Sequence, residues 1–370
     1  MTEVIEVITK RDLDDFIRFP YLLYSKDPFF APPLMKEMYE KFSERNPFFL
    51  HAHAKYFLAK KDGEISGRVA AIMNKKHNEF HKDKTGFFGF FESTNNYAIA
   101  SALLEKVSEM HTGNGMEIMR GPMNFSTNEE CGFLIEGFHK PPLLMTPYNP
   151  PYYNDFMERF GMKKAKDLYA YICDIPDELP VKILRVADIA ERRGIRVRPI
   201  NKKKFNNEMI IFKDVYNSAW EKNWGFIPIT EEETADMANK LKSIAIPKLT
   251  LIAEKDEQPV GFMGMLPDFN FVLRKMKGKL NFLTIAKAIY YTKKIPDLRL
   301  LLLGIKPEYR NKGVDALLFR EGFRGIKENY KKYKRVEFSW VLEDNIHVQR
   351  LTEMIGAKLY KRYRIYERRL

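Results

Sequence analysis

The stretch Leu300–Phe319, LLLLGIKPEYRNKGVDALLF, decides the fold of this chain. Four leucines lead to Gly304, a proline turn follows, and the residues after Gly313 have the apolar spacing of a helix. This pattern predicts a buried strand that joins a helix through a basic corner. The first turn of a helix leaves N–H groups unpaired and carries the positive end of the helix dipole. The corner therefore predicts a phosphate or pyrophosphate site, where Gly313 lets the ligand approach and Arg310 and Lys312 add charge.

The length and composition indicate a globular protein with two domains. The 370 residues are many for one core and suit two domains of roughly 180 residues each. The composition, 45% hydrophobic and 30% charged, is that of a globular protein. No run of about 18 apolar residues predicts a spanning helix, and residues 1–15 do not resemble a targeting signal. We expect a cytoplasmic protein.

The cysteines, the histidines and the net charge limit the disulfides, metal sites and partners to be expected. Cys131 and Cys173 cannot form a disulfide framework, and we expect both to be free buried thiols. The histidines lack the spacing of metal ligands, so no metal is expected. A net charge of +13 favours acidic partners, although a solvated lysine surface explains it equally.

Two short patterns recur along the chain and suggest a duplication. Residues 58–67 match residues 252–261 at an offset of 194, and each segment predicts a strand, a tight turn and a second strand. Residues 158–163 match residues 353–358 at an offset of 195, where a short helix ends at a glycine and a strand follows. The shared order of elements around these matches supports two repeats of one fold.

The periodicity predicts the same succession of strands and helices in both halves. In the second half we expect strands at 195–197, 249–254, 260–266, 300–303, 336–342 and 358–366, and helices at 205–220, 231–242, 315–328 and 345–354. In the first half we expect strands at 56–59, 65–72, 85–91, 117–119 and 168–173, and helices at 97–111 and 152–159. This order predicts an α/β fold with mixed sheets. The proline-bearing segment 174–180 is the expected linker, which gives domains 1–178 and 179–370.

With these elements in place, the second half resembles a GNAT-superfamily acyl-CoA N-acyltransferase, and the whole chain resembles a tandem pair of such domains. The coenzyme A loop of that family has Arg or Gln, two residues, Gly, one residue, then Gly or Ala. Arg310 and Gly313 match this pattern, and Asp315 departs from it. The resemblance implies that acetyl-CoA or another acyl-CoA is the donor and that the following residues hold it: Ile305, Arg310, Lys312, Gly313, Val314, Ala316 and, at the pantetheine arm, Asn345.

Asp315 and the first half limit the resemblance. A carboxylate at Asp315 repels a pyrophosphate unless it points away, yet aspartate is also favoured in the first turn of a helix. In the first half the corresponding strand runs into residues 94–97 without a basic or glycine corner. We therefore expect the N-terminal domain to lack a cofactor.

Acyl transfer to an amine needs a base for the amine proton and an acid for the leaving thiolate. Glu337, in the strand after the helix, is the candidate base, and Glu343 and Asp344 at the end of that strand are alternatives. Many members of the resembled family place a tyrosine acid where this chain has Thr352, and a threonine hydroxyl is a poor acid. The acid for the leaving thiolate is therefore unassigned. Tyr360 and Tyr363 are the nearest phenols in sequence, and we single out Tyr360 and Thr352 as candidates.

The proline-rich segment 121–153 is the candidate acceptor site. Its rigid turns would hold a wall of polar and aromatic side chains, of which we single out Asn124, Ser126, Asn128, Glu129 and Tyr148. A packed connection that closes the first domain explains the segment equally well.

A second insertion, residues 269–296, has seven basic residues and no acidic one. It predicts a basic amphipathic helix or helical pair. Three functions compete with simple packing: a lid over an acyl chain, a docking face for an acidic carrier protein or an anionic membrane, and a nucleic-acid patch.

The preferred hypothesis is an N-acyltransferase that moves an acyl group, expected to be acetyl, from acyl-CoA to a small-molecule or peptide amine. One alternative is an aminoacyl-tRNA-dependent transferase of the tandem-GNAT type. The other is a non-catalytic module that binds a lipid, a carrier or a protein. The sequence does not identify the acceptor, the acyl length or the oligomeric state.

Overall fold

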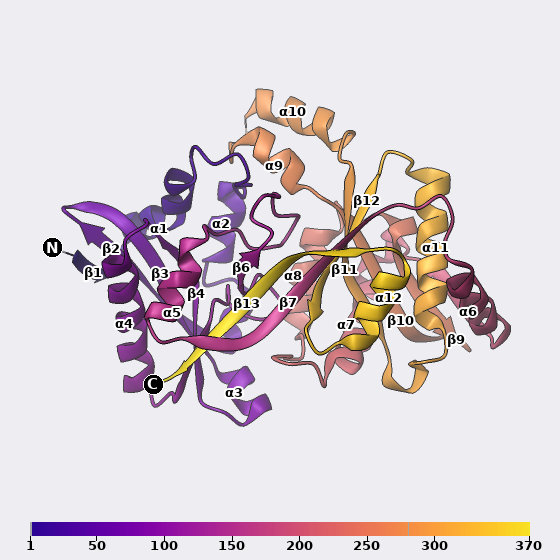
Figure 1. Cartoon of the computed structure of the whole chain (residues 1–370), viewed down its shortest axis with the longest axis horizontal. Helices are drawn as coiled ribbons and strands as arrows, with labels where there is room; N and C mark the ends of the chain where they lie inside the picture. Colours follow the sequence, from indigo (N-terminus) through magenta and orange to yellow (C-terminus); the bar gives the residue numbers. More distant parts are fainter. Residues whose placement is uncertain (1, 280) are drawn as a thin grey trace. The chain divides into compact units, whose positions relative to one another are not determined.

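The computed structural model describes residues 2–279 and 281–370 and divides into two compact units (Figure 1). Unit 1 consists of residues 1–168, 270–289 and 361–370, and unit 2 consists of residues 169–269 and 290–360. The sequence predicts a single boundary near residue 178. The division into repeats at 1–178 and 179–370 stays a prediction, because each compact unit contains residues from both of these ranges.

In unit 2 a mixed sheet of six strands has the order β8-β9-β10-β11-β12-β7. The first four strands are antiparallel, and β11 and β12 are parallel. The strands are β8 (Ile195–Pro199), β9 (Thr250–Lys255), β10 (Gln258–Pro267), β11 (Asp297–Ile305), β12 (Arg335–Leu342) and the end of β7 (Lys163–Asp174). The helices are α6 (Val181–Arg192), α7 (Phe205–Trp220), α8 (Glu231–Leu241), α11 (Val314–Asn329) and α12 (Ile346–Met354), with 3-10 turns at 202–204, 247–249 and 307–309.

Unit 1 repeats this order as β1-β2-β3-β4-β5-β13, with β6 paired to β13. Here too the first four strands are antiparallel and the next pair is parallel. The strands are β1 (Thr2–Glu6), β2 (Ala52–Lys61), β3 (Glu64–Asn74), β4 (Thr85–Ser93), β5 (Ile118–Gly121), β6 (Phe133–Glu136) and most of β13 (Lys358–Arg369). The helices include α1 (Lys10–Leu23), α2 (Met35–Lys41), α3 (Lys75–His81), α4 (Tyr97–Gly113), α5 (Tyr152–Arg159) and α9 (Asn270–Met276), with a 3-10 turn at 47–50.

The last strand of each repeat completes the sheet of the other repeat. β7 follows α5 in the first half of the sequence but ends beside β12 in unit 2, and β13 follows α12 but pairs with β5 in unit 1. The duplication that the sequence predicts is confirmed by this common strand order. Its two glycine helix ends are confirmed as well, because Gly161 and Gly356 have φ angles of +81° and +91°.

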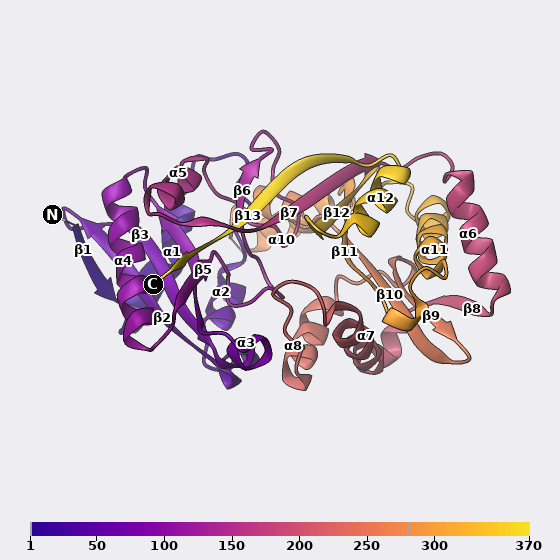
Figure 2. The ribbon, with the colours of Figure 1, turned by 60° about the horizontal axis from the view of Figure 1, so that its bottom comes forward.

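Helices cover both faces of the unit 2 sheet (Figure 2). On one face α11 packs so closely that a Cβ on Gly322 would lie 2.5 Å from the Met263 methyl group. On the other face α7 packs against β10, and the rings of Phe212 and Phe262 are 5.1 Å apart. Neighbouring residues of β10 therefore face different helices, as strand alternation requires.

Most predicted elements are present, and several real ones were missed. The helix predicted at 205–220 is confirmed residue for residue as α7, and the insertion 269–296 forms a helical pair, α9 and α10 (Phe282–Thr292). Five elements were not predicted from the sequence: α1, α2, α3, α6 and β6. Cys131 and Cys173 are buried, and neither forms a disulfide among the described residues, as expected. Among the residues that the structure describes, no helix is long and apolar enough to cross a membrane.

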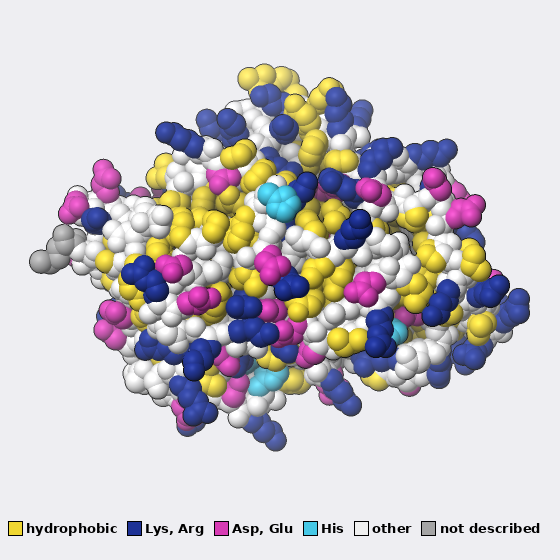
Figure 3. All heavy atoms as spheres, viewed as in Figure 1, with side chains coloured by type: hydrophobic (Ala, Val, Ile, Leu, Met, Phe, Trp, Pro, Cys, Tyr) yellow, Lys and Arg dark blue, Asp and Glu magenta, His cyan; other side chains and the backbone are white. Residues whose placement is uncertain are grey.

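Basic side chains are spread over the face of the molecule shown in Figure 3 and are not gathered in one patch. Many of them pair with acids, for example Arg364 with Asp167 at 2.8 Å and Arg335 with Asp297 at 2.7 Å. On this face the positive charge is therefore distributed and not concentrated at one place.

Candidate functional site

The basic corner lies between the end of β11 and the start of α11 in unit 2. Gly313 caps α11 with φ +83° and ψ +13°, and Asn311 before it also has a positive φ of 58°. The first helical hydrogen bond runs from Leu317 N–H to the Gly313 carbonyl at 3.0 Å. The backbone N–H groups of Val314 and Asp315 therefore lie in the first turn, where a helix offers them to an anion.

Glycine at position 313 has a structural cause that was not expected from the sequence. A Cβ there would lie 2.8 Å from the Val186 carbonyl oxygen and 2.9 Å from Val186 Cγ1, both on α6. Glycine is therefore required by the contact with α6 and by the left-handed backbone. The approach of a ligand to Gly313, expected from the sequence, stays a prediction.

The two basic side chains of the corner are placed differently. Arg310 donates from Nη2 to the carbonyl of Ala219, near the end of α7, at 2.6 Å. Lys312 is exposed, and its ammonium group lies 5.0 Å from the centre of the Tyr309 ring. Arg310 thus links the corner to α7, while Lys312 presents its charge to solvent.

Asp315 points toward α12. Its Oδ2 lies 3.0 Å from Nε2 of His347, and its Oδ1 accepts a 2.9 Å hydrogen bond from the N–H of Ala316. The carboxylate therefore serves the first turn of its own helix. The Ala316 N–H, which the resemblance assigns to pyrophosphate, donates to Asp315 in this structure.

β11 and β12 separate beside this corner. Their parallel ladder joins Asp297–Leu300 to Arg335–Phe338, and both strands continue past it. Beyond the ladder, the β11 edge that faces β12 has backbone groups that the ladder does not use. Asn345, predicted to meet the pantetheine arm, follows β12 and caps α12 by accepting a 3.2 Å hydrogen bond from Val348 N–H.

A buried polar network crosses these strands where they still pair. Arg299 and Glu337 face each other in register, and both side chains are almost fully buried. Arg299 Nε donates to Ser339 Oγ at 2.9 Å, and Ser339 Oγ donates to Glu337 Oε1 at 2.5 Å. The phenol of Tyr360, at the start of β13, donates to Glu337 Oε2. The structure thus brings together Glu337 and Tyr360, the predicted base and acid.

Two members of this network, Arg299 and Ser339, were missed from the sequence. A buried carboxylate is costly to desolvate unless a cation and hydrogen bonds compensate it, and these two residues do so. Arg299 gave a usable signal, since a charged residue inside a leucine-rich buried strand needs a partner. Ser339 gave none, because its role depends on the register between strands.

The other candidate side chains of unit 2 are bound elsewhere. Thr352 is buried, and its hydroxyl donates to the Gln349 carbonyl of its own helix at 2.8 Å. This bond is local helix packing, and the structure adds nothing to its candidacy as an acid. His347 is exposed on α12.

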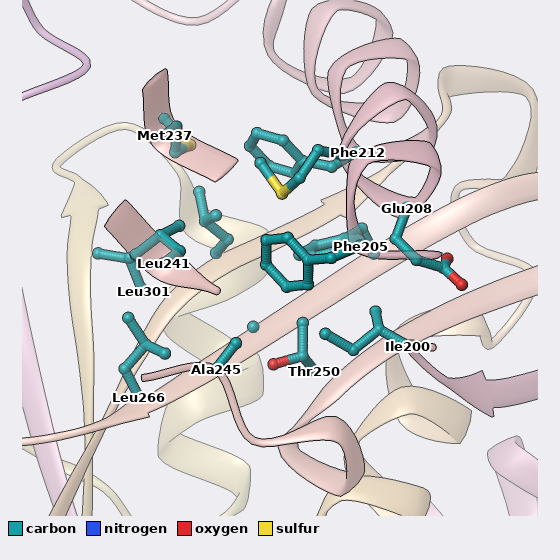
Figure 4. A pocket seen from close by; sticks show the side chains of 14 residues that line it. Ile200, Phe205, Glu208, Phe212, Met237, Leu241, Ala245, Thr250, Leu266 and Leu301 are labelled. Atoms are coloured by element: carbon teal, nitrogen blue, oxygen red, sulfur yellow. The ribbon is translucent and has the colours of Figure 1, made fainter. Parts of the chain in front are cut away.

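An apolar cavity lies on the α7 and α8 face of the same sheet (Figure 4). The cavity itself has a volume of about 30 Å³, and the hollow of about 470 Å³ around it includes open solvent. Carbon atoms dominate its walls, because the Glu208 carboxylate turns away to Arg198, with two contacts of 3.0 Å. The cavity is lined by Ile200, Phe205, Glu208, Met209, Phe212, Met237, Leu241, Ala245, Thr250, Phe262, Gly264, Leu266, Leu301 and Leu302.

Thr250 is the polar exception in this lining. Its side chain is 7% exposed, and its Oγ1 is a buried atom without a hydrogen-bond partner among the described residues. A buried hydroxyl usually has a partner, so this atom is suited to a polar group on whatever fills the cavity.

The cavity and the polar network share one face of the sheet. Leu266, in the cavity wall, lies in register with Arg299, and Arg299 lies in register with Glu337. Side chains in register on neighbouring strands point to the same face. The network therefore adjoins the cavity along the sheet.

The predicted acceptor residues lie in unit 1 and bond within it. Asn124 accepts from Phe90 N–H at 2.8 Å, Ser126 accepts from Asn128 N–H at 3.2 Å, and Glu129 pairs with Lys41 at 2.5 Å. The phenol of Tyr148 donates to Asp27. These contacts fit a packed connection, and an acceptor role for these residues stays a prediction.

No protein-family model matches the sequence. In solved structures, the same fold occurs in a tandem GNAT protein from the clavulanic acid biosynthesis pathway, with a TM-score of 0.59 and 11% identity over 100% of this chain and 98% of that one. A GCN5-related N-acetyltransferase from Anabaena variabilis has a TM-score of 0.53 and 10% identity over 100% of this chain and 72% of that one. The chain therefore has the tandem GNAT fold, an α/β fold with mixed sheets.

Two relatives match this chain over nearly its whole length and show its family. Protein YghO of Escherichia coli (strain K12) is 35% identical over 98% of this chain and 94% of its own length. The bacterial ceramide synthase of Caulobacter vibrioides is 31% identical over 99% of this chain and 97% of its own length. The protein belongs to the family that includes these two.

Proposed function

We propose that this protein is an N-acyltransferase that transfers an acyl group from acyl-CoA to an amine with a long apolar chain. The observation that carries the proposal is the apolar cavity beside the Arg299–Glu337–Tyr360 network. A hydrolase or a transferase for small polar amines has no need of a carbon-lined cavity next to its proton-transfer group. The name of the Caulobacter relative supports the proposal, since a ceramide is an N-acylated long-chain amino alcohol.

The residues around the basic corner fit a coenzyme A donor. Lys312 supplies an exposed positive charge for the phosphates, and the first turn of α11 supplies the N–H groups of Val314 and Asp315. The edge of β11 past Leu300 can hydrogen-bond to the amides of a pantetheine arm. When bound there, acyl-CoA supplies an acyl group activated as a thioester.

The cavity would take the apolar chain of the acceptor. Apolar walls favour an aliphatic chain because burial removes its surface from water. Thr250 would then meet a hydroxyl or another polar group on that chain. This placement brings the amine end toward the sheet face that carries Glu337.

Glu337 and Tyr360 would manage the proton. The amine nitrogen forms a bond to the acyl carbon and loses a proton, while the carbon–sulfur bond breaks and the thiolate gains one. Glu337 accepts a proton from the amine through Tyr360 or an intervening water, and Tyr360 is the acid for the thiolate. Arg299 and Ser339 hold Glu337 in place and keep its charge compensated.

The test combines thiol release with product identification. Purified protein is incubated with acetyl-CoA and with longer acyl-CoAs, each with a long-chain amino alcohol or with ethanolamine. We expect thiol release and an amide product of the expected mass, with the long-chain amino alcohol preferred to ethanolamine. The absence of acyl-CoA binding and thiol release across this panel would overturn the proposal, and salt-dependent tRNA binding in their place would favour the aminoacyl-tRNA alternative.

Substitutions in the cavity lining, with a control outside it, test whether the cavity binds the amine. Ala245→Phe places a ring in the cavity and is expected to raise the KM for the long-chain amine roughly tenfold, while the KM for acyl-CoA stays unchanged. Thr250→Val keeps the volume and removes the hydroxyl, which covers the case in which Ala245→Phe does not fold. Ile210→Phe, on the exposed side of α7, is the control and should leave both KM values unchanged.

A further inference from the structure

Helix α10 exposes large apolar side chains to solvent. Phe282 is 85% exposed, Leu283 71% and Ile289 61%, and Ile285 and Tyr290 are exposed as well. Single exposed apolar residues are common on proteins, but five within eleven residues form a patch. A helix that is apolar on its exposed side needs a partner outside the part of the chain that carries it.

α10 is a defined helix with local anchors. At its start Asn281 and Thr284 cap each other, because Thr284 N–H donates to Asn281 Oδ1 at 3.0 Å and Asn281 N–H donates to Thr284 Oγ1 at 2.7 Å. At its end the Lys332 ammonium group donates to the Thr292 carbonyl at 3.0 Å. The exposure of the apolar residues is thus the property of an ordered helix.

The neighbouring helix α9 is packed in the ordinary way. Its Val272 and Met276 are buried, and Asn270 Nδ2 donates to the carbonyls of Leu143 at 2.9 Å and Pro142 at 3.2 Å. Of the helical pair, α9 therefore attaches the insertion to unit 1. The apolar side of α10 is exposed and is available to a binding partner.

Lysines surround the apolar patch. Residues 269–296 have no acidic residue, and the exposed lysines there are Lys275, Lys277, Lys279, Lys287, Lys293 and Lys294. Figure 3 shows apolar side chains with dark-blue basic ones around them at the place of α10 in Figure 1. The partner must therefore be apolar at its centre and negatively charged at its rim.

We propose that α10 docks on the surface of an anionic lipid bilayer, with its apolar side chains in the interface and its lysines on the headgroups. An eleven-residue helix cannot span a bilayer but can lie in the interfacial plane. A bilayer accepts a convex helix face without a complementary groove, which an acidic carrier protein would have to provide. Lysine suits diffuse attraction to headgroups, whereas fixed anionic pairs on a protein favour arginine.

This docking gives the proposed acyl transfer a physical advantage. The inference stands on α10 itself, and it deepens the proposed function by adding the location of the substrate. An amine with a long apolar chain is dissolved in the membrane and is scarce in water. A docked enzyme takes up such an acceptor where it is concentrated.

Vesicle binding of the purified full chain tests the inference without measuring catalysis. The protein is floated with phosphatidylcholine vesicles and with vesicles in which about a third of the lipid is phosphatidylglycerol. We expect binding to the anionic vesicles that weakens with added salt, and little binding to neutral ones. Phe282→Trp places an indole in the patch, and its emission should shift to the blue when anionic vesicles are added.

Matched variants decide whether α10 is responsible. Leu283→Ser with Ile289→Ser is expected to weaken vesicle binding roughly tenfold or more. Ile8→Ser with Leu22→Ser changes two residues that are 82% and 71% exposed elsewhere in unit 1, and should bind like the wild type. Equal binding of both double variants, or binding to an acidic carrier protein but not to vesicles, would overturn the inference. A protein that acylates the long-chain amino alcohol but never binds vesicles contradicts this inference alone and leaves the proposed function intact.

Discussion

The two units contain the same strand-to-helix corner, and they use it in opposite ways. In unit 1, the end of β4 is covered by α5: the Tyr152 phenol donates to the Ser93 carbonyl at 3.0 Å, and Ser93 N–H donates to the Tyr153 phenol at 2.7 Å. Asn96 then caps α4 by accepting from Ala98 N–H at 3.0 Å. In unit 2 the corresponding corner has a left-handed glycine and an exposed lysine. The unit 1 corner is covered by two tyrosines of α5, whereas the unit 2 corner is open and basic.

Each unit also places a glutamate between an arginine and a tyrosine. Glu92 of unit 1 lies in register with Arg68 and accepts from Tyr153 at 2.9 Å. Glu337 of unit 2 lies in register with Arg299 and accepts from Tyr360. Only the second pair is on a sheet face with a described cavity. The comparison indicates that duplication left two similar polar clusters, and that the setting of a cluster decides what it can do.

The largest expected effect separates the two glutamates. Glu337→Gln removes the proposed base, and we expect kcat to fall about 10²- to 10³-fold. Glu92→Gln should leave kcat close to the wild-type value. Thiol release under saturating acyl-CoA measures both.

Folding has to be controlled in this comparison, because Glu337 is buried against Arg299. Thermal unfolding of both variants provides the control, and Tyr360→Phe is a milder change in the same network. An equal loss of kcat in Glu92→Gln and Glu337→Gln would show that the two clusters do not differ in the way proposed.

The next prediction concerns pH and stability in unit 1. Burial raises the pKa of Glu92 from 4.5 to about 7, even though Arg68 nearby lowers it. Below pH 4.5 the carboxyl group is protonated in both the folded and the unfolded protein. Between pH 4.5 and about 7 the unfolded chain ionises while folded Glu92 keeps its proton, so the free energy of unfolding falls, by at most about 3 kcal/mol.

Glu92→Gln should remove this part of the pH dependence. The measurement is urea unfolding of wild type and variant near pH 4.5 and near pH 8. Glu105→Gln, at an exposed acid of the same unit, is the control and should follow the wild type. If Glu92→Gln keeps the wild-type slope, the carboxyl group is already ionised in the folded state.

A smaller effect on acyl-CoA affinity is expected when a negative charge is introduced at each of the two strand-to-helix corners. Lys312→Glu reverses the exposed charge at the open corner and should weaken acyl-CoA binding about tenfold at low salt. Asn95→Glu makes a similar change at the closed corner, where Asn95 is exposed, and should have no effect on that affinity. Calorimetric titration with coenzyme A measures both, and equal affinities of the two variants would contradict a coenzyme A site at the unit 2 corner.

The sequence predicts the helices and strands of the two units better than it predicts which strands pair. The bounds of α7 and α5 agree because apolar spacing and end signals are local properties of the chain. α1 was missed although Thr9 and Asp12 form a capping box, a signal that is readable from the sequence. The exchange of β7 and β13 could not be predicted, because strand partners far apart in sequence leave no local pattern.

The same limit applies to the site. Glu337 and Tyr360 were singled out by residue type and position, and the structure shows them in contact, although their catalytic roles stay predictions. Ser339 and the cavity were invisible, since the first depends on strand register and the second on walls from several elements. The contact of Gly313 with Val186 was not foreseen, because Val186 lies more than a hundred residues away, and the approach of a ligand to Gly313 stays a prediction.

Asp315 gives the smallest and most diagnostic effect on the open corner. Asp315→Asn keeps an acceptor for Ala316 N–H and removes one negative charge from the first turn of α11. If that charge only opposes the phosphates, acyl-CoA should bind about two- to fivefold more tightly. Glu308→Gln, an exposed acid of the same corner outside the helix, controls for the general loss of charge. Weaker binding in Asp315→Asn would instead mean that the contact with His347 orders the corner, and that this departure from the family pattern helps to build the site.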